Sequence, residues 1–402
     1  MLKKHWLFLL IILFLIILKI IFLTNVPEPI LDESKYYIPA AKAYLEGAPD
    51  PNFQHPPLGK EILAVDMFFF GDNSLGWRLF SILAGFGSLA LTYILALKLS
   101  KKPAIASFAV AILGFETLWF LYSTLAFLEI FLVLFSLLAL LFLWLYIEKP
   151  SYKHLFFFSL SIGAAVAVKW SALLLLPPSL ILALLFSKES ASKILINAVF
   201  SLSLIILVYT ASYIPYLISH TTTEWVTLHR QIYEFHNSLT FKNVFGYTSF
   251  NDSLFYHPIG WFLEGGAVYT LYKQNDSISR LVTMINPFVL WGGTILFFWY
   301  GLRGFLKRDP AISFIVLNLI FLTIPWLFVS RVTYIYYLLS SLPLFSILIA
   351  FFLFRFWENP LKRWDVYGFL AANAVFFFVF LPLLVGIQTP TSYLAWLIGY
   401  PK

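Results

Sequence analysis

Long apolar stretches recur from one end of the chain to the other, and short polar stretches separate most of them. A helix that crosses the ~30 Å hydrocarbon layer of a bilayer needs about 20 predominantly apolar residues. The pattern therefore predicts an all-α polytopic membrane protein with about eleven transmembrane helices. These helices are expected at residues 5–24, 77–98, 103–122, 125–147, 154–170, 171–187, 193–218, 286–306, 311–329, 332–355 and 364–386.

Two segments between the expected spans are much longer than the others, at about 25–76 and about 219–285. The first contains the amphipathic stretch "SKYYIPAAKAYLEG", which is typical of a helix lying in the membrane interface. The second is rich in aromatic and polar residues. Neither is long enough for an ordinary large soluble domain, so residues 1–402 are expected to form a single membrane-embedded domain.

The distribution of charge predicts the orientation. Charged residues make up 12% of the chain, against about 25% in soluble domains, and the mean hydropathy is +0.84. Lys and Arg are packed into the short loops, as at Lys101 and Lys102, whereas most acids lie near the two long segments. By the positive-inside rule, the N-terminus is cytoplasmic and both long segments face outward. The net charge of +7 is then explained by membrane topology and does not indicate a nucleic-acid partner.

Because the chain contains no cysteine, disulfides and thiol chemistry are excluded.

Ionisable residues stand at the outer ends of the expected helices. Asp32 and Glu33 follow the first helix directly, and the rigid turn "HPPLGK" with His55 and Lys60 comes about 20 residues later. Single charges at such positions often cap a helix or extend to the interface. However, charge at membrane depth is costly and commonly functional, so convergence on one face favours a site. The further candidates are Arg78, Glu129, Lys169 and Arg331.

The order of several short motifs resembles the protein O-mannosyltransferases. "LDE", "HPPLGK", "WRLFSILAGFGSLALTY", "YSTLAFLEIFLVLF" and "AVKW" follow one another as in that family, and "YHPIGW", "INPFVLW" and "RVTYIYYLLSSLPLF" are similar to its later segments. The family belongs to the GT-C class of glycosyltransferases, which also includes the aminoarabinose transferases acting on lipid A. A GT-C-like fold is therefore expected.

Some positions depart from the family pattern. Glu116 and Glu129 stand where the family usually has Asp, and Ser123-Thr124 replaces a Ser-Arg pair, so an expected cation is missing. The segment at 219–285 is too short for the β-trefoil MIR domain of the eukaryotic enzymes. The chain thus resembles a compact prokaryotic form, with the active site expected on the outer face of the plasma membrane.

The resemblance implies an inverting transfer of a sugar, mannose in this family, from a polyprenyl (dolichyl) phosphate to Ser or Thr hydroxyls of a protein. Asp32 would act as general base, and Glu33 would orient the acceptor or the base. Glu129 would hold the sugar or one of the cations, and His257 and Trp261 would line the acceptor groove. No metal or other cofactor is expected. The residues expected to bind the donor phosphate are His55, Lys60, Arg78, Lys169 and Arg331.

Two alternatives stay open from the sequence. The same donor chemistry on a lipid or glycan acceptor would match the aminoarabinose transferases. A transporter would belong to a different class, but it would usually show broken helices near the midplane and often an internal repeat. The expected partners are a polyprenyl-phosphate sugar, a protein or peptide acceptor, the bilayer and a second copy in a dimer, with no nucleic acid. The sequence leaves open the sugar, the acceptor and the oligomeric state.

Overall fold

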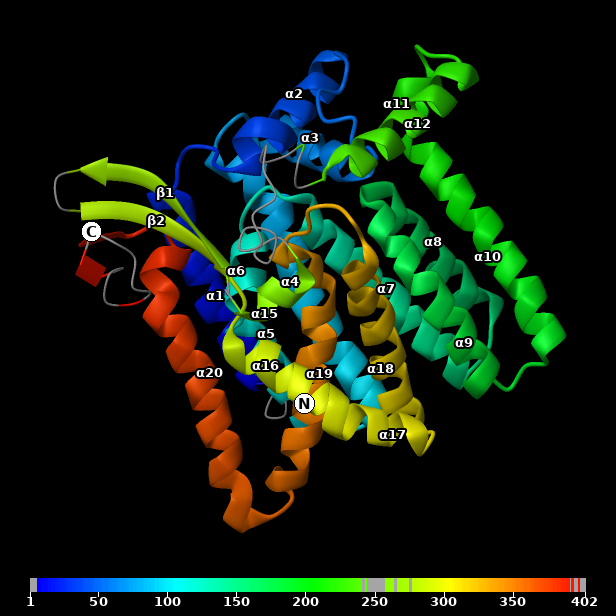
Figure 1. Cartoon of the computed structure of the whole chain (residues 1–402), viewed down its shortest axis with the longest axis vertical. Helices are drawn as coiled ribbons and strands as arrows, with labels where there is room; N and C mark the ends of the chain where they lie inside the picture. The colour runs from blue at the N-terminus through cyan, green and yellow to red at the C-terminus, as the bar shows by residue number, and fades with distance from the viewer. Residues whose placement is uncertain are drawn as a thin grey trace.

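The membrane core consists of long apolar helices that run side by side (Figure 1). The computed structural model describes residues 6–240, 243, 257–263, 266–274, 277–390, 392, 393 and 397. Within these ranges, eight helical segments are long and apolar enough to cross a membrane, and three shorter apolar segments accompany them. All eleven lie where the apolar pattern predicted spans, so the helical membrane architecture is confirmed. The long segments are Leu7–Asn25, Ser74–Ser100, Leu128–Glu148, Ala191–Ser212, Pro287–Leu306, Pro310–Phe328, Ile335–Trp357 and Pro360–Leu384. The shorter ones are Pro103–Gly114, Tyr152–Val168 and Trp170–Phe186.

Local sequence explains where several of these segments begin or break. The third predicted span is interrupted at Glu116, whose carboxylate caps the next short helix by accepting a hydrogen bond from the Trp119 N–H. The fifth and sixth predicted spans meet at Lys169, whose extended backbone separates two helices. Proline follows the N-cap of several helices, a position where its missing N–H costs nothing. The core elements are α1 (Trp6–Asn25), α4 (Ser74–Ser100), α5 (Pro103–Gly114), α6 (Thr117–Tyr122), α7 (Leu128–Glu148), α8 (Tyr152–Val168), η3 (Trp170–Leu175), α9 (Leu176–Phe186), α10 (Ala191–Ser212), α16 (Pro287–Leu296), η4 (Phe297–Gly301), α17 (Leu302–Leu306), α18 (Pro310–Thr323), η5 (Ile324–Phe328), η6 (Ile335–Ser341), α19 (Leu342–Trp357), η7 (Pro360–Lys362) and α20 (Arg363–Leu384).

Short helices and a small sheet cover one end of the core (Figure 1). The predicted interfacial stretch forms a π-helical turn that runs into α2. The sheet is antiparallel with strand order β1-β2-β3, and it is an exception to the expected all-α fold. Its third strand comes from beyond the last span, and Ser277 pairs with Pro390. Such pairing between distant segments leaves no local pattern in the sequence. The elements at this end are η2 (Glu33–Tyr37), α2 (Ile38–Glu46), α3 (Leu58–Phe70), α11 (Ile214–Leu217), α12 (Thr222–Ser238), α15 (Pro258–Leu263), β1 (Gly266–Gln274), β2 (Ser277–Met284) and β3 (Gln388–Pro390).

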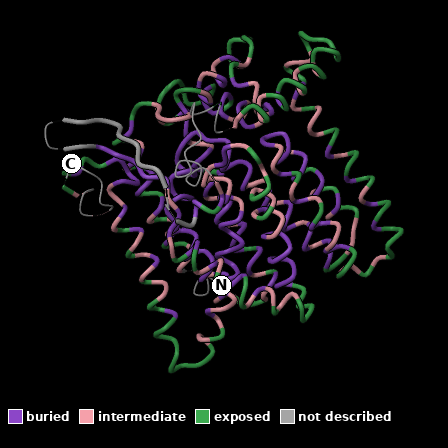
Figure 2. Tube along the Cα trace, in the orientation of Figure 1, coloured by how far each residue is buried: buried purple, intermediate pink, exposed green. Residues whose placement is uncertain are grey.

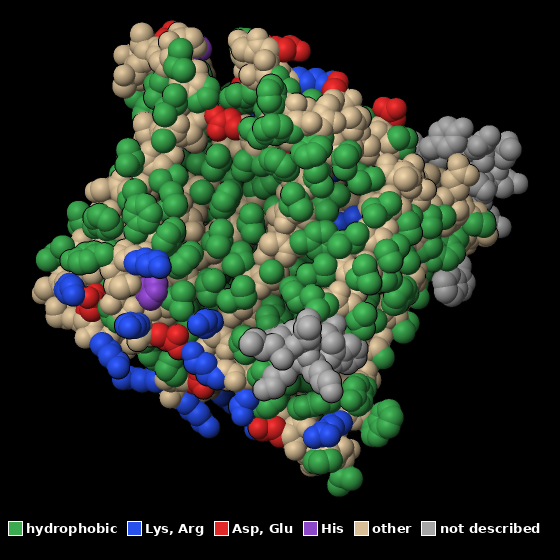
Figure 3. All heavy atoms as spheres, turned by 180° about the vertical axis from the view of Figure 1, so that it is seen from behind, with side chains coloured by type: hydrophobic (Ala, Val, Ile, Leu, Met, Phe, Trp, Pro, Cys, Tyr) green, Lys and Arg blue, Asp and Glu red, His purple; other side chains and the backbone are tan. Residues whose placement is uncertain are grey.

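The helices differ in how much lipid-facing surface they carry. The apolar window of α7 is 72% buried inside the protein, whereas that of α10 is 22% buried. Figure 2 shows the same contrast between a buried centre and exposed outer helices. Seen from behind, hydrophobic side chains form a broad surface, and Lys and Arg gather at the end opposite α2 and α12 (Figure 3). This is the distribution that the positive-inside rule associates with a cytoplasmic face.

A buried lysine from the first helix reaches the pair that departs from the family pattern. Lys19 is 2% exposed, and its Nζ donates to the carbonyl oxygen and Oγ of Ser123 and to Oγ1 of Thr124, each at 2.8 Å. Ser123 is the C-cap of α6, where a positive charge is favourable because the carbonyl groups at a helix end carry partial negative charge. A cation from α1 thus contacts the pair at which the family pattern has an arginine.

A glycine in α4 makes room for this contact. A Cβ atom built at Gly85 would lie 2.6 Å from the Cβ of Ser123, whereas one at Gly368 in α20 would meet nothing within 4 Å. We therefore expect Gly85→Ala to destabilise the protein by about 1–3 kcal/mol through overpacking. Gly368→Ala is the matched control and should be neutral or slightly stabilising. Thermal melting of the detergent-purified variants tests this, and equal melting temperatures for the two would contradict it.

Candidate active site

The backbone just before the acidic pair is strained. Leu31 adopts a φ of +53°, a left-handed conformation that is uncommon for a residue with a bulky side chain. The chain then forms the π-helical turn η2, with Asp32 as its N-cap residue. Strained backbone and π-helical turns both occur preferentially at functional sites. Two features of the backbone thus mark the segment that carries the acidic pair.

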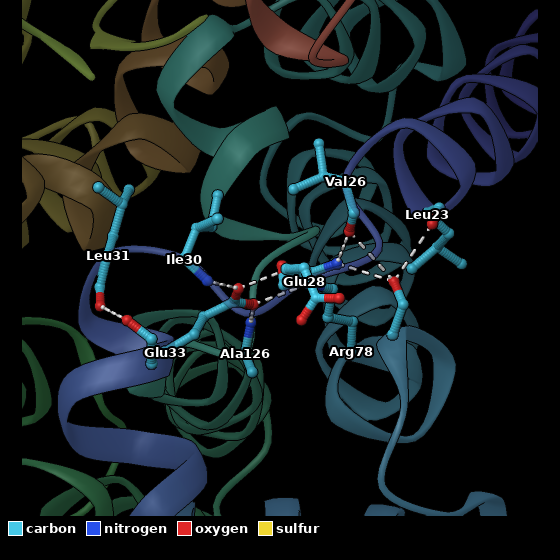
Figure 4. Close-up of polar contacts among 10 residues, drawn as sticks. Leu23, Val26, Glu28, Ile30, Leu31, Glu33, Arg78 and Ala126 are labelled. Carbon is cyan, nitrogen blue, oxygen red and sulfur yellow. Dashed lines mark hydrogen bonds and ion pairs between the residues drawn. The ribbon is translucent and has the colours of Figure 1, made fainter. Parts of the chain in front are cut away.

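Glu33 is held in place by four hydrogen bonds (Figure 4). Its Oε1 accepts from Nε of Arg78 at 2.9 Å and from the Ala126 N–H at 2.6 Å. Its Oε2 accepts from Nη2 of Arg78 at 2.7 Å and from the Ile30 N–H at 3.1 Å. Both side chains of the ion pair are 0% exposed. With its acceptor sites filled, Glu33 has no free oxygen for the predicted contact with the acceptor, whereas the predicted orienting of the base Asp32 stays a prediction.

The remaining donors of Arg78 are also occupied. Nη1 donates to the carbonyl oxygen of Val26 and to Oγ of Ser74, and Nη2 donates to the carbonyl oxygen of Glu28. Together with the bonds to Glu33, these contacts engage every N–H of the guanidinium. Arg78 therefore has no N–H left for a donor phosphate, and its predicted role is corrected to a structural one. The reason is that the charge lies inside the protein and needs internal partners.

Asp32 lies outside this network and is half-buried. Its pKa is raised above the usual range of an aspartate, chiefly by burial and further by the negative charge of Glu129. The positive charges of Lys169 and Lys35 act in the opposite direction. The charges of Glu129 and Lys169 therefore both influence the protonation of Asp32. A carboxylate with a raised pKa is better suited to accept a proton than an ordinary one.

Four predicted residues line one cavity of about 440 Å³. His55 comes from the first outer segment, and Glu129 lies in the first turn of α7. Lys169 lies at the junction of α8 and η3, and Arg331 follows η5. The predicted convergence is therefore observed for these four side chains. Aromatic residues complete much of the wall: Trp170, Phe235, Trp326, Tyr334, Tyr336 and Tyr337.

Glu129 and Lys169 form a buried ion pair at 2.5 Å through Oε1 of the glutamate. The other oxygen, Oε2, is buried and has no hydrogen-bond partner among the described residues. Buried polar atoms nearly always have a partner, so this oxygen is suited to accept a hydrogen bond from a bound molecule. Lys169 also lies 5.5 Å from the centre of the Tyr336 ring.

A histidine that the sequence analysis missed holds Arg331. Nη1 of Arg331 donates to Nδ1 of His236 at 2.6 Å, and Nη2 donates to the Tyr337 hydroxyl at 2.8 Å. The other ring nitrogen of His236 contacts the carbonyl oxygen of Gln54 at 3.0 Å. Burial and the charge of Arg331 lower the pKa of His236 to about 4. The imidazole is therefore neutral near pH 7, accepting at Nδ1 and donating at Nε2.

His55 and Lys60 have different places. The His55 ring centre lies 5.5 Å from that of His236, and burial together with the charge of Lys169 holds the pKa of His55 well below its usual value. Lys60 is 0% exposed and pairs with Asp50, and its Nζ donates to the carbonyl oxygens of Asn52 and His55 at 2.7 Å. Lys60 is not among the residues that line the cavity. It shapes the loop that presents His55, which corrects its predicted contact with the donor.

Trp261 and His257, the two predicted acceptor residues, differ in their position relative to the cavity. Trp261 is 2% exposed, and its ring packs edge-on against Tyr337 at 6.2 Å, directly behind the cavity wall. His257 stays at the start of α15, where Nδ1 accepts from the Ile259 N–H at 3.3 Å, and it does not line the cavity. Parts of the second outer segment, at 241–242, 244–256, 264–265 and 275–276, lie outside the described residues.

Two stretches of sequence contained the missed residues. His236 stands in "QIYEFHNS" on the amphipathic helix α12, and the tyrosines stand in "RVTYIYYLLSS". A histidine or tyrosine in such a context is usually part of a packed interface, so residue type alone does not identify these residues as part of a site.

Glu116, whose role the sequence left open, caps α6 and accepts a hydrogen bond from the Asn286 N–H at 2.9 Å. Its role is structural.

Comparison with solved structures shows that this helical membrane core has the fold seen in GT-C proteins. The structure of the Saccharomyces cerevisiae protein O-mannosyltransferase Pmt1-Pmt2 complex bound to the sugar donor matches with a TM-score of 0.79 at 12% identity. That match covers 100% of this chain and 93% of the other. ArnT from Cupriavidus metallidurans bound to undecaprenyl phosphate matches with a TM-score of 0.61 at 14% identity, covering 95% and 77%. At these identities the likeness establishes the fold.

Sequence comparison adds a similarity to one family. Residues 54–216 match the family described as dolichyl-phosphate-mannose-protein mannosyltransferase. A polyprenol-phosphate-mannose–protein mannosyltransferase of Mycolicibacterium smegmatis is 29% identical over 153 residues, or 37% of this chain and 29% of that relative. The protein of the same name from Corynebacterium glutamicum is 24% identical over 471 residues, covering 93% of this chain and 88% of the relative. The predicted resemblance to the protein O-mannosyltransferases is therefore confirmed.

The ion pair at Glu33 should dominate the stability of this region. Arg78→Met leaves a buried carboxylate without its cation, and we expect a loss of about 3–5 kcal/mol. Glu33→Gln combined with Arg78→Met removes both charges and should cost less than the sum of the two single changes. Melting temperatures of the three variants form a double-mutant cycle. Strict additivity would show that the pair does not act as a unit.

Proposed function

We propose that the protein transfers a mannosyl group from a polyprenyl-phosphate donor to a Ser or Thr hydroxyl of a protein, with inversion at the anomeric carbon. The observation that carries the proposal is the cavity in which Lys169 and Arg331 face the same space as the unpartnered Oε2 of Glu129. Asp32 is not one of the residues that line this cavity, but the charges of Glu129 and Lys169 both act on its carboxyl group. A phosphate needs cations, a sugar needs acceptors for its hydroxyls, and the incoming hydroxyl needs a base. All three kinds of group are present.

In the proposed reaction, Asp32 accepts the proton of the acceptor hydroxyl as the oxygen attacks the anomeric carbon. The bond from that carbon to the phosphate oxygen breaks, and the polyprenyl phosphate leaves with the bonding electron pair. Arg331 and Lys169 stabilise the charge that develops on the phosphate, and the neutral ring of His55 supplies a further hydrogen bond. Oε2 of Glu129 accepts hydrogen bonds from the sugar. No metal ion or organic cofactor takes part.

The structure suggests why Arg331 is suited to the phosphate. His236 and Tyr337 each take one of its N–H groups, which orders the guanidinium and leaves other N–H groups for a ligand. An arginine held in this way binds phosphate with less loss of side-chain entropy than a free one. Because His236 is neutral, it positions Arg331 without adding a competing charge.

A protein acceptor is supported by the names of the relatives, which are protein mannosyltransferases. The chain spans 29% of the length of the mycobacterial relative, and its own acceptor remains part of the proposal. The likeness to ArnT is weaker than that to Pmt1-Pmt2, so a lipid or glycan acceptor is not favoured. By the distribution of charge, we place the reaction on the outer face of a prokaryotic plasma membrane.

Removing the proposed base tests the mechanism. We expect Asp32→Asn to lower transfer from radiolabelled dolichyl phosphate mannose to a Ser/Thr-rich peptide by about 10²- to 10⁴-fold. Its melting temperature should match the wild type because Asp32 lies outside the Glu33 network. Wild-type activity in the folded variant would remove Asp32 from the reaction. If the wild type consumed the donor only when a lipid or glycan acceptor was present, the proposal of a protein acceptor would be wrong.

The acid limb of the pH profile offers a second test. Asp32 acts only when ionised, so activity falls as the pH drops through its pKa. The exposed Lys35 lowers that pKa, so Lys35→Gln should raise it and move the acid limb of kcat/KM to higher pH. Lys42→Gln is the control, because Lys42 lies on the neighbouring helix and pairs with Asp72 at 2.7 Å. If the acid limb of kcat/KM lay at the same pH in the Lys35→Gln and Lys42→Gln variants, the assignment of that limb to Asp32 would be contradicted.

A further inference from the structure

A second charged cavity lies at the opposite end of the molecule from the candidate active site. Its volume is about 530 Å³, and it lies where η4 and α17 meet the start of α18 and the end of α19. Figure 1 shows α17 at the end away from α2 and α12, and Figure 3 shows Lys and Arg gathered at that end. The proposed transfer reaction makes no use of this cavity.

Three cations from separate positions converge on it. Arg303 belongs to α17, Lys307 follows that helix, and Arg355 lies in the last turn of α19. Close packing brings these elements together, since a Cβ atom at Gly304 would lie 2.4 Å from the side chain of Ile312. The convergence therefore depends on the tertiary fold.

Two aromatic side chains order the arginines. Trp299 and Tyr300 belong to η4, a π-helical turn inserted between α16 and α17, and such turns are frequent at functional sites. The guanidinium of Arg303 lies 5.2 Å from the Trp299 ring, and that of Arg355 lies 5.7 Å from the Tyr300 ring. Contacts of this kind hold a guanidinium in place while leaving its N–H groups available.

Acidic side chains neutralise the positive charge of the cavity only in part. Asp309 is the acid that lines it, and Oδ1 of Asp309 accepts from the Ile312 N–H at 2.9 Å as the cap of α18. Among the described residues, Arg303, Lys307 and Arg355 form no ion pair with an acidic side chain. The cavity thus carries three cations against one anion, and that anion is already engaged.

We propose that this cavity binds the phosphate group of an anionic phospholipid at the membrane surface. Arginines bind phosphate oxygens through paired N–H groups, and basic pockets between transmembrane helices bind lipid head groups. Lysines and arginines that merely anchor a helix extend separately into the interface, whereas these surround a common space. A tryptophan at this level suits the same interface. A lipid is favoured over a free anion because the cavity is built from membrane-crossing helices.

Lipid-dependent thermal stabilisation tests the proposal. Detergent-purified protein is titrated with dioleoylphosphatidylglycerol, with dioleoylphosphatidylcholine and with inorganic phosphate. We expect only phosphatidylglycerol to stabilise the wild type strongly. Arg303→Gln combined with Arg355→Gln should weaken the apparent affinity by about 25-fold, from about fivefold for each cation. Each single variant should lose about fivefold. The matched control is Lys362→Gln with Arg363→Gln, which removes the same charge at the same end outside the cavity and should change the affinity less than twofold.

The outcomes separate the alternatives. If inorganic phosphate stabilised the wild type but not the Arg303/Arg355 double variant, the cavity would be a phosphate site. Its ligand would then be a soluble phosphate and not a lipid. Equal losses in both double variants would overturn the proposal, because the effect would then be general charge. Equal stabilisation of the wild type by both lipids would overturn it as well. Should the double variant not fold, the single variants and native mass spectrometry of retained lipid on the wild type give the same decision.

Discussion

The arrangement at the outer end of the core depends on the buried ion pair between Glu33 and Arg78. A charge removed from water is costly unless its partners are complete, and here each side chain has all of its hydrogen bonds inside the protein. These bonds connect the segment after α1, the N-terminal part of α4 and the loop before α7. As a result, Asp32 and Glu129, which lie on different segments, have a fixed relation to each other.

Ionisable groups at this level of the molecule have two kinds of environment. In the first, an interior charge is saturated by internal partners, as with Lys19 at the end of α6 and Lys60 at the loop of His55. In the second, a group faces the cavity with bonding capacity to spare, as with Oε2 of Glu129 and the guanidinium of Arg331. This difference in saturation, more than the type of residue, separates supporting groups from those suited to act on a ligand. The same criterion distinguishes the cations of the second cavity.

Both cavities fit the way in which a membrane lipid lies in the bilayer. The phosphate of a membrane lipid lies at the surface of the bilayer while its chains lie within, so a protein must offer cations at the ends of its helices. The helices that bear most lipid-facing surface, such as α10, lie at the edge of the core. The more buried α7 carries Glu129 in its first turn. Glu129 thus lies on a helix that is mostly buried within the protein.

The sequence by itself determined the membrane class, the position of the apolar helices and the set of charged residues that includes Asp32, Glu129, Lys169 and Arg331. Apolar length and the sign of loop charge act locally, so they are readable along the chain. The tertiary structure alone decided which of two adjacent acids became structural, since Arg78 and the Ala126 N–H reach Glu33 from distant segments. It likewise decided that His236 holds Arg331 and that β3 pairs with β2. These outcomes rest on contacts between residues far apart in the chain, and no local pattern encodes them.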